Sequence, residues 1–242
     1  IIIEIGHKYT EEGEEEQHHM VPTISPTSWT KLQTIQNQGL RTASGCLLMS
    51  SQEHIHRECK VLPVKDHSVL LTKQHTAGCI LETSPGNRLL GLPLPQRNLK
   101  PTHLAHLPEV REKFRGSTHK DVIKSLHTTA VASTLSTYQV NRVLQDTPPD
   151  INPEEKQLPR GARSELARLR SGFSRNLNSY LHRLDEPVPD TCPDCNIHQH
   201  TTNHLFNCTS NPTDLEPIHL WTQPRKSAQF LKLLPHDDDD EG

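Results

Sequence analysis

The sequence contains few of the side chains that build a large hydrophobic core. Aromatic residues make up 4% of the 242 residues and apolar residues 32%, whereas globular domains average about 45–50% apolar residues when glycine is included. Proline is frequent instead, with 19 residues. Because proline interrupts regular secondary structure, and because strand patterns are scarce, we predict a mainly α fold of short helices with long Pro-rich connectors.

The chain also lacks an apolar run that would suit a bilayer. A membrane-spanning helix needs about 20 predominantly apolar residues, and the opening Ile1-Ile2-Ile3 is followed at once by Glu4. The sequence therefore predicts no membrane partner and no signal peptide. It does not begin with methionine, so we expect a cleavage product or a gene fragment.

Signatures of common enzyme classes are missing as well. A polymerase holds two divalent ions on paired aspartates at a turn between strands, but the only adjacent aspartates, Asp237 to Asp240, stand in a polar tail. The sequence has neither a glycine-rich phosphate loop nor the Gly-x-Ser-x-Gly turn of many hydrolases. We therefore predict no catalytic residue and no small-molecule substrate.

Charge is distributed unevenly along the chain. Residues 1–16 contain six Glu and one Lys, and residues 237–242 contain four Asp and one Glu. The net charge of -3 therefore hides a basic body between two acidic ends. We expect the ends to be disordered, and a basic body suits a polyanionic partner, although simple solubility would also explain it.

Apolar residues recur at helical spacing in five segments. These predicted helices are 28–44, the stretch after Pro63, 119–136, 160–184 and 225–234. Gly45 ends the first of them. Proline and glycine interrupt residues 82–118 repeatedly, so we predict a long connector there.

The segment 160–184 has the strongest helical signal. Its apolar stripe consists of Leu166, Leu169, Phe173, Leu177, Leu181 and Leu184. Gly172 lies inside the stripe and is expected to bend the helix or to allow a close approach.

The same region is rich in arginine. Residues 156–184 hold seven Lys or Arg residues against one acid, Glu165. The planar guanidinium suits forked contacts to phosphate oxygens. The residues that we predict to bind nucleic acid are Arg160, Arg163, Arg168, Arg170 and Arg175. The alternative is an ordinary solvated helix face.

The six cysteines fall into two sets. Cys46, Cys59 and Cys79 are scattered and are interpreted as small buried groups. The other three, Cys192, Cys195 and Cys208, lie beside histidines. This arrangement favours a metal site over disulfides and fits a reducing compartment.

The cysteine spacing predicts a structural zinc site. Two residues separate Cys192 from Cys195, and three separate His204 from Cys208, so that one helical turn places the second pair on one side. Four protein ligands leave no open position for water, which indicates a structural ion. His200 is the alternative ligand, with spacing closer to a retroviral knuckle.

Several blocks of the sequence resemble the region after the polymerase core in jockey-like non-LTR retrotransposon reverse transcriptases. The matching blocks are 32–37, 40–41, 45–46, 61–67, 158–160, 169–172, 177–181, 192–195, 202–208 and 211–213. The resemblance covers about 28–234. Its most specific parts are the blocks that look like the family's basic helix (158–160, 169–172 and 177–181) and its terminal zinc module (192–195, 202–208 and 211–213). It implies an RNA-directed DNA polymerase whose catalytic palm, like its endonuclease, is absent from this sequence.

The resemblance further implies a domain organisation and a setting. The predicted parts are an acidic lead (1–26), thumb- or connector-like helices (27–150), a basic helix (151–190), a zinc module (191–212), a short helix (213–236) and an acidic tail (237–242). The implied partners are element RNA, target DNA or both, in an intracellular ribonucleoprotein of nucleus and cytoplasm. A protein-interaction adaptor docking through its leucine-striped helix, and a decayed remnant without function, are the alternatives.

Overall fold

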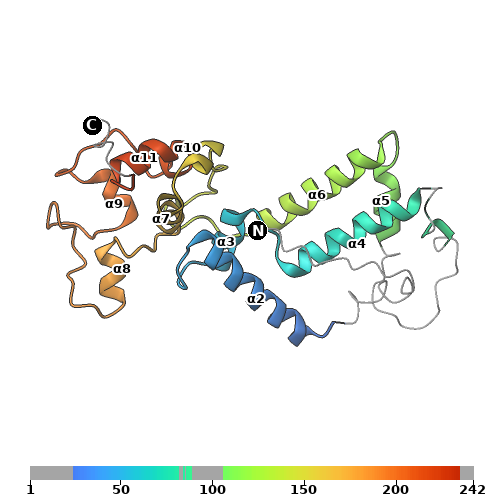
Figure 1. Ribbon diagram of the computed structural model, residues 1–242, viewed down its shortest axis with the longest axis horizontal. Coiled ribbons are helices and arrows are strands. Elements are labelled where there is room, and N and C mark those ends of the chain that lie inside the picture. The colour runs from blue at the N-terminus through green and yellow to red at the C-terminus, as the bar shows by residue number, and fades with distance from the viewer. Residues whose placement is uncertain (1–23, 82–83, 85, 89–105, 235–242) are drawn as a thin grey trace, which may run out of the picture. The chain divides into compact units, whose positions relative to one another are not determined.

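The computed structural model describes residues 24–81, 84, 86–88 and 106–234 (Figure 1). The predicted acidic tail and nearly all of the predicted acidic lead lie outside the described residues, as does most of the connector predicted at 82–118. The described part is mainly helical, which confirms the mainly α part of the predicted fold class. It contains no strand, only an isolated antiparallel bridge between Thr191 and Gln199.

The described helices follow one another from Pro26 to Phe230. They are α2 (Pro26–Ser44), α3 (Gln52–Cys59), α4 (Val64–Ile80), α5 (Leu107–Lys113), α6 (His119–Ser136), the 3-10 helix η4 (Pro153–Gln157), α7 (Arg160–Ser171), α8 (Asn178–Arg183), α9 (Thr202–Asn207), α10 (His219–Thr222) and α11 (Pro224–Phe230). None of these described helices has the length and apolar character that crossing a membrane requires.

The chain forms two compact units. The first contains the described residues up to Gln36 and those between Val61 and Thr137. The second contains Asn37–Lys60 and the described residues from Tyr138 onward. The helices predicted near 28–44, after Pro63 and at 119–136 are confirmed as α2, α4 and α6.

The first unit is a small helical assembly of α4, α5 and α6. Its buried core residues are Leu62, Leu70, Ala77, Val110, Val122 and Leu126. An ion pair of 2.8 Å between Lys73 and Glu109 links α4 to α5. Because α5 lies within 82–118, the prediction of an uninterrupted connector was wrong for its last part. Pro108 there occupies a position in the first helical turn, where proline is tolerated.

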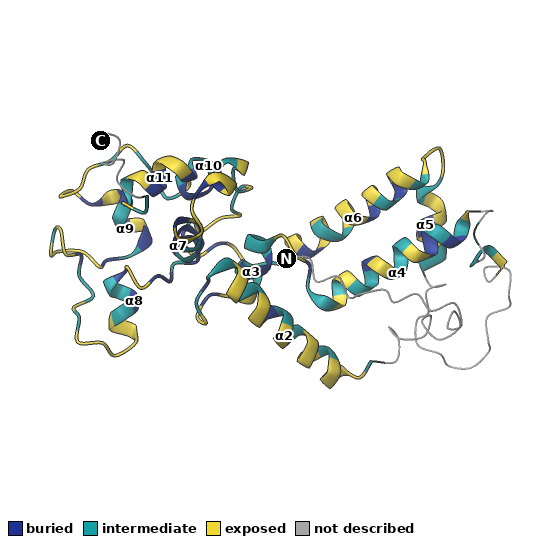
Figure 2. Cartoon of the chain, viewed as in Figure 1, coloured by how far each residue is buried: buried dark blue, intermediate teal, exposed yellow. Residues whose placement is uncertain are grey.

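The core of the second unit is built around α7. Leu166 and Leu169 are almost fully buried. Most residues of α7 are buried, as the dark blue of this helix in Figure 2 shows. The two leucines belong to one hydrophobic cluster with residues from later segments, among them Phe206, Leu220 and Trp221. Segments that follow α7 in the chain therefore supply its hydrophobic cover.

The helix predicted over 160–184 is two helices, and this prediction was wrong. Gly172 adopts φ 75° and ends α7, which is the left-handed conformation common just past a helix. The chain then turns and restarts as α8 at Asn178. Leu177 remains fully buried, whereas Leu184 is exposed. The apolar spacing was correct up to Leu177, but it continued across a break.

Gly45 ends α2 and allows a close approach. Its φ is 77°, and a Cβ atom at this position would lie 2.6 Å from both Cβ and Oγ of Ser164.

We expect Gly45→Ala to destabilise the protein by roughly 1–3 kcal/mol, since backbone strain and overlap act together. Urea unfolding would measure the loss. Gly39→Ala is the control, because nothing lies within 4 Å of a Cβ there; a helix-interior alanine should stabilise by about 0.5–1 kcal/mol. Equal changes in the free energy of unfolding for Gly45→Ala and Gly39→Ala would contradict the explanation by close approach to Ser164.

Candidate functional site

The four side chains predicted to bind zinc lie together in the second unit. The ligand atoms of Cys192, Cys195, His204 and Cys208 are all within 4.8 Å of one another. Cys192, His204 and Cys208 are buried, and Cys195 is partly exposed. These residues are close enough to hold a metal ion.

The separations inside the cluster agree with tetrahedral coordination. A zinc–sulfur bond of about 2.3 Å places two sulfurs about 3.8 Å apart at the corners of a tetrahedron. The Sγ atoms of Cys192 and Cys208 are 3.8 Å apart. Cys195 Sγ lies 3.3 Å from Nε2 of His204. Three sulfurs and one nitrogen form a closed ligand set, which suits a structural ion rather than a hydrolytic one.

Helix α9 positions the second half of the cluster. The hydroxyl of Thr201 accepts a hydrogen bond from the backbone N–H of His204 at 3.3 Å, which caps the helix. Cys208 is the residue at the end of the same helix. One turn therefore brings His204 and Cys208 to the same side, as the spacing predicted.

A tight backbone turn positions the first half. The N–H of Asn196 donates to the carbonyl of Cys192 at 2.8 Å, and the N–H of Cys192 donates to the carbonyl of His198 at 2.8 Å. Backbone N–H groups of His198 and Ile197 donate to the sulfur of Cys195 and lower its pKa to about 6. A lowered pKa favours the thiolate, which is the form that binds metals.

His200, the alternative ligand, has a different role. Its Nδ1 accepts a hydrogen bond of 3.1 Å from the backbone N–H of Asn178. The ring is buried, and burial lowers its pKa. The ligand set of the cluster contains His204 instead, so the preference for His204 agrees with the structure.

The metal cluster is fastened to α7 and α8. Thr202 donates a hydrogen bond of 3.0 Å to the carbonyl of Leu169. The side chain of Asn178 donates to the carbonyl of Thr191 at 2.9 Å, and Ser179 donates to the carbonyl of His200 at 2.7 Å. The loop around the ligands and the arginine-rich segment therefore form one folded body.

The other three cysteines agree with the interpretation as small structural groups. Cys46 and Cys79 are buried, and Cys59 is half-buried. Burial raises the pKa of all three thiols, to about 11 for Cys59. Protonated, desolvated thiols are poor nucleophiles and poor metal ligands.

The predicted phosphate-binding arginines have different environments. Arg160, Arg163 and Arg175 are exposed, and none of them forms an ion pair within the described part of the chain. Arg168 is only partly available, because its guanidinium donates to the carbonyl of Gly45 at 2.7 Å and to Glu165 at 3.1 Å.

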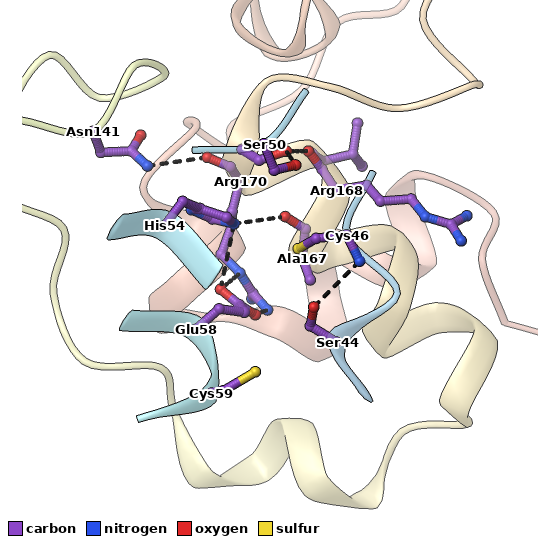
Figure 3. A network of polar contacts seen from close by, with 12 residues as sticks. Ser44, Cys46, Ser50, His54, Glu58, Cys59, Asn141, Ala167, Arg168 and Arg170 are labelled. Carbon is purple, nitrogen blue, oxygen red and sulfur yellow. Dashed lines mark hydrogen bonds and ion pairs between the residues drawn. The ribbon is translucent and has the colours of Figure 1, made fainter. Parts of the chain in front are cut away.

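Arg170 is not available to a ligand, and its inclusion among the phosphate contacts was wrong. Its side chain is fully buried between Glu58 and Glu155, and Figure 3 shows it beside Glu58. One guanidinium nitrogen donates to Glu155 at 2.7 Å and to the carbonyl of Leu220 at 2.8 Å. Burial alone would lower the pKa of Arg170, but the two carboxylates outweigh it and raise the pKa.

Two arginines outside the predicted set lie close to the metal loop. Arg142 and Arg183 both line a cleft with residues 199 and 201–203. Arg183 had a weak signal in the sequence, since it belongs to the arginine-rich segment. Arg142 had none, because no other Lys or Arg lies near it in the sequence.

No protein-family model, no curated protein and no solved structure matches this chain. The function is therefore inferred from the site.

The leucine stripe, which the adaptor alternative used as a docking face, is mostly internal. Leu166, Leu169 and Leu177 are at most 2% exposed and belong to the core of the second unit. A partner chain has no access to them while this unit is folded.

Proposed function

We propose that this chain is a non-catalytic RNA- or DNA-binding segment of a retrotransposon RNA-directed DNA polymerase, stabilised by one structural zinc ion. The observation that carries the proposal is the pairing, within one folded unit, of a four-ligand cluster with exposed arginines that have no acidic partner among the residues that the structure describes. The resemblance of the sequence to jockey-like elements suggests the parent enzyme, with element RNA or target DNA as the partner.

Zinc is favoured by the chemistry of the ligand set. Three thiolates and one imidazole nitrogen are soft or borderline ligands, and a tetrahedral arrangement of them is typical of zinc. The ion would be held by Cys192, Cys195, His204 and Cys208. Its role would be to fix the loop against α7 and α8.

The exposed arginines supply the affinity in this proposal. Arg160 and Arg163 lie on the first turn of α7, and Arg175 lies in the loop that follows it. Contacts of arginine with phosphates carry little sequence information and weaken with salt. The proposal is therefore one of sequence-independent binding.

Protein docking through the leucine stripe is less well supported. The stripe packs inside its own unit, whereas the three arginines remain in solvent. The accessible chemistry of this region is thus cationic, which favours a polyanion.

Replacing Arg160, Arg163 and Arg175 together with Gln is expected to weaken binding of single-stranded RNA or duplex DNA roughly tenfold or more. The slope of log affinity against log salt should become shallower by about 0.7 to 0.9 for each phosphate that an arginine no longer neutralises. Fluorescence anisotropy across a salt series would measure both quantities.

The matched control replaces Lys31, Lys65 and Lys120 with Gln. These residues are also exposed, so net charge changes equally. The control should bind nearly as well as the unaltered protein. Equal weakening by both triple variants, or no binding by the unaltered protein at low salt, would refute the proposal.

A further inference from the structure

A cleft beside the metal loop has a volume of about 170 Å³. It is several times larger than the roughly 10–15 Å³ that one water molecule needs. Its walls come from the segment before η4, from α8 and from the loop that leads into α9. The residues that matter for its chemistry are Arg142, Phe173, Arg183, Gln199, Thr201 and Asn203.

Two guanidinium groups are held over the same aromatic ring in this cleft. The guanidinium carbon of Arg142 lies 4.8 Å from the ring centroid of Phe173, and that of Arg183 lies 5.6 Å from it. Stacking on a ring leaves the N–H groups at the edge of each guanidinium free to donate. Two forks of donors are therefore preorganised around one space.

Among the described residues, no carboxylate lines the cleft to balance its positive charge. Within the described ranges, neither Arg142 nor Arg183 forms an ion pair. Asp190 accepts a hydrogen bond of 3.1 Å from the side chain of Gln199, which lines the cleft. Because like charges repel, two neighbouring unpaired guanidinium groups favour an anion between them.

The metal loop builds the polar wall of the cleft. Thr201 caps α9 by accepting the N–H of His204, and Asn203 follows at the second position of that helix with an exposed side chain. Thr202 is anchored to α7 through the carbonyl of Leu169 at 3.0 Å. The position of this wall therefore depends on α9, the helix that also positions the ligands His204 and Cys208.

We propose that this cleft binds a phosphate group between Arg142 and Arg183. A phosphate offers several oxygen acceptors and suits two converging guanidinium forks. The inference deepens the proposed function and rests on it only for the source of the phosphate, which is the backbone of a nucleic acid. Free phosphate is the other source, and separate titrations distinguish the two.

The test compares the full zinc-loaded chain with a variant carrying Arg142→Gln and Arg183→Gln. A labelled single-stranded oligonucleotide is titrated by anisotropy, and inorganic phosphate is titrated separately by NMR shifts of the backbone amides of Thr201 and Thr202, which line the cleft in every variant. We expect the variant to bind the oligonucleotide roughly tenfold or more weakly. Its salt slope should be shallower by about 0.7, because the one phosphate of a single strand that lies in the cleft is no longer neutralised. The control variant, with Arg225→Gln and Lys226→Gln on α11, should behave like the unaltered chain.

A second variant guards against misfolding. Asn203→Asp places a carboxylate in the cleft without touching the arginine stacking, and an acid near a helix N-terminus does not disfavour the helix. It should weaken binding of the oligonucleotide as well. Its thermal unfolding is expected to match that of the unaltered chain.

The outcomes separate the two proposals. Oligonucleotide binding that both cleft variants leave unchanged would overturn the cleft and leave the proposed function standing. Binding of inorganic phosphate alone, abolished in the variants, would support the cleft and refute the proposed function. Binding of neither probe by the unaltered chain would overturn both.

Discussion

Removing the metal from the second unit is expected to unfold it. Structural zinc contributes on the order of 10 kcal/mol to the folding of small modules, and α9, which carries His204, also supplies Phe206 to the core around α7. A chelator should release one equivalent of zinc per chain and abolish the near-ultraviolet signal of the buried Trp221. The core of the first unit contains none of the four ligands, so its helices should keep their far-ultraviolet signal.

Two substitutions make this experiment specific. Cys208→Ser removes one buried ligand and should lower zinc content well below one equivalent, with loss of the same tryptophan signal. Cys59→Ser changes a half-buried cysteine outside the cluster and should leave zinc bound. A purified chain that contains no stoichiometric metal, with a fold that a chelator leaves intact, would refute the zinc proposal.

Replacing Arg170 with Met is expected to destabilise the second unit by about 3–5 kcal/mol, because two buried carboxylates would lose their counter-charge. Glu58 and Glu155 both contact the guanidinium, and each is nearly buried. Arg170→Lys should restore little, since one ammonium group does not reproduce the fork. Urea unfolding, followed by tryptophan fluorescence, would measure the change in the free energy of unfolding.

A control variant and a rescue variant test whether the loss of stability comes from the buried charges around Arg170. Arg163→Met lies on the same helix but is exposed, so its effect should stay within about 0.5 kcal/mol. Adding Glu58→Gln and Glu155→Gln to Arg170→Met should recover part of the stability, since no buried charge then remains. Similar losses of stability for Arg163→Met and Arg170→Met would contradict the assignment of Arg170 to the core.

The sequence allowed the features that depend on near neighbours to be predicted. Helix α6 was predicted at its observed bounds, and α2 and α4 were predicted within two residues at their starts. The four clustered ligands were identified because two local turns, one at Cys192–Cys195 and one in α9, determine their geometry. Spacing carries that information directly.

Features that depend on distant segments were not predictable in this way. The sequence around Arg170 indicates a surface cation, because its partner Glu58 lies 112 residues earlier in the chain. The break at Gly172 was missed because apolar spacing continued to Leu177 across it. Helix α3, whose sequence is mostly polar, supplies Glu58 and gave no periodic signal. Tertiary contacts decide these points, and spacing along the chain does not report them.

The ion pair between Glu58 and Arg170 also imposes an order on biosynthesis. The two residues are separated by 112 positions, and the whole of the α4–α6 assembly is synthesised between them. At about 5–20 residues per second, Glu58 must stay hydrated for several seconds before its partner leaves the ribosome. The α4–α6 assembly is then free to fold first, as a nascent domain. Residues 37–60 of the second unit cannot pack until the rest of that unit, from Tyr138 onward, has been synthesised. Any pause in translation between these two codons would lengthen that exposed interval without altering the finished protein.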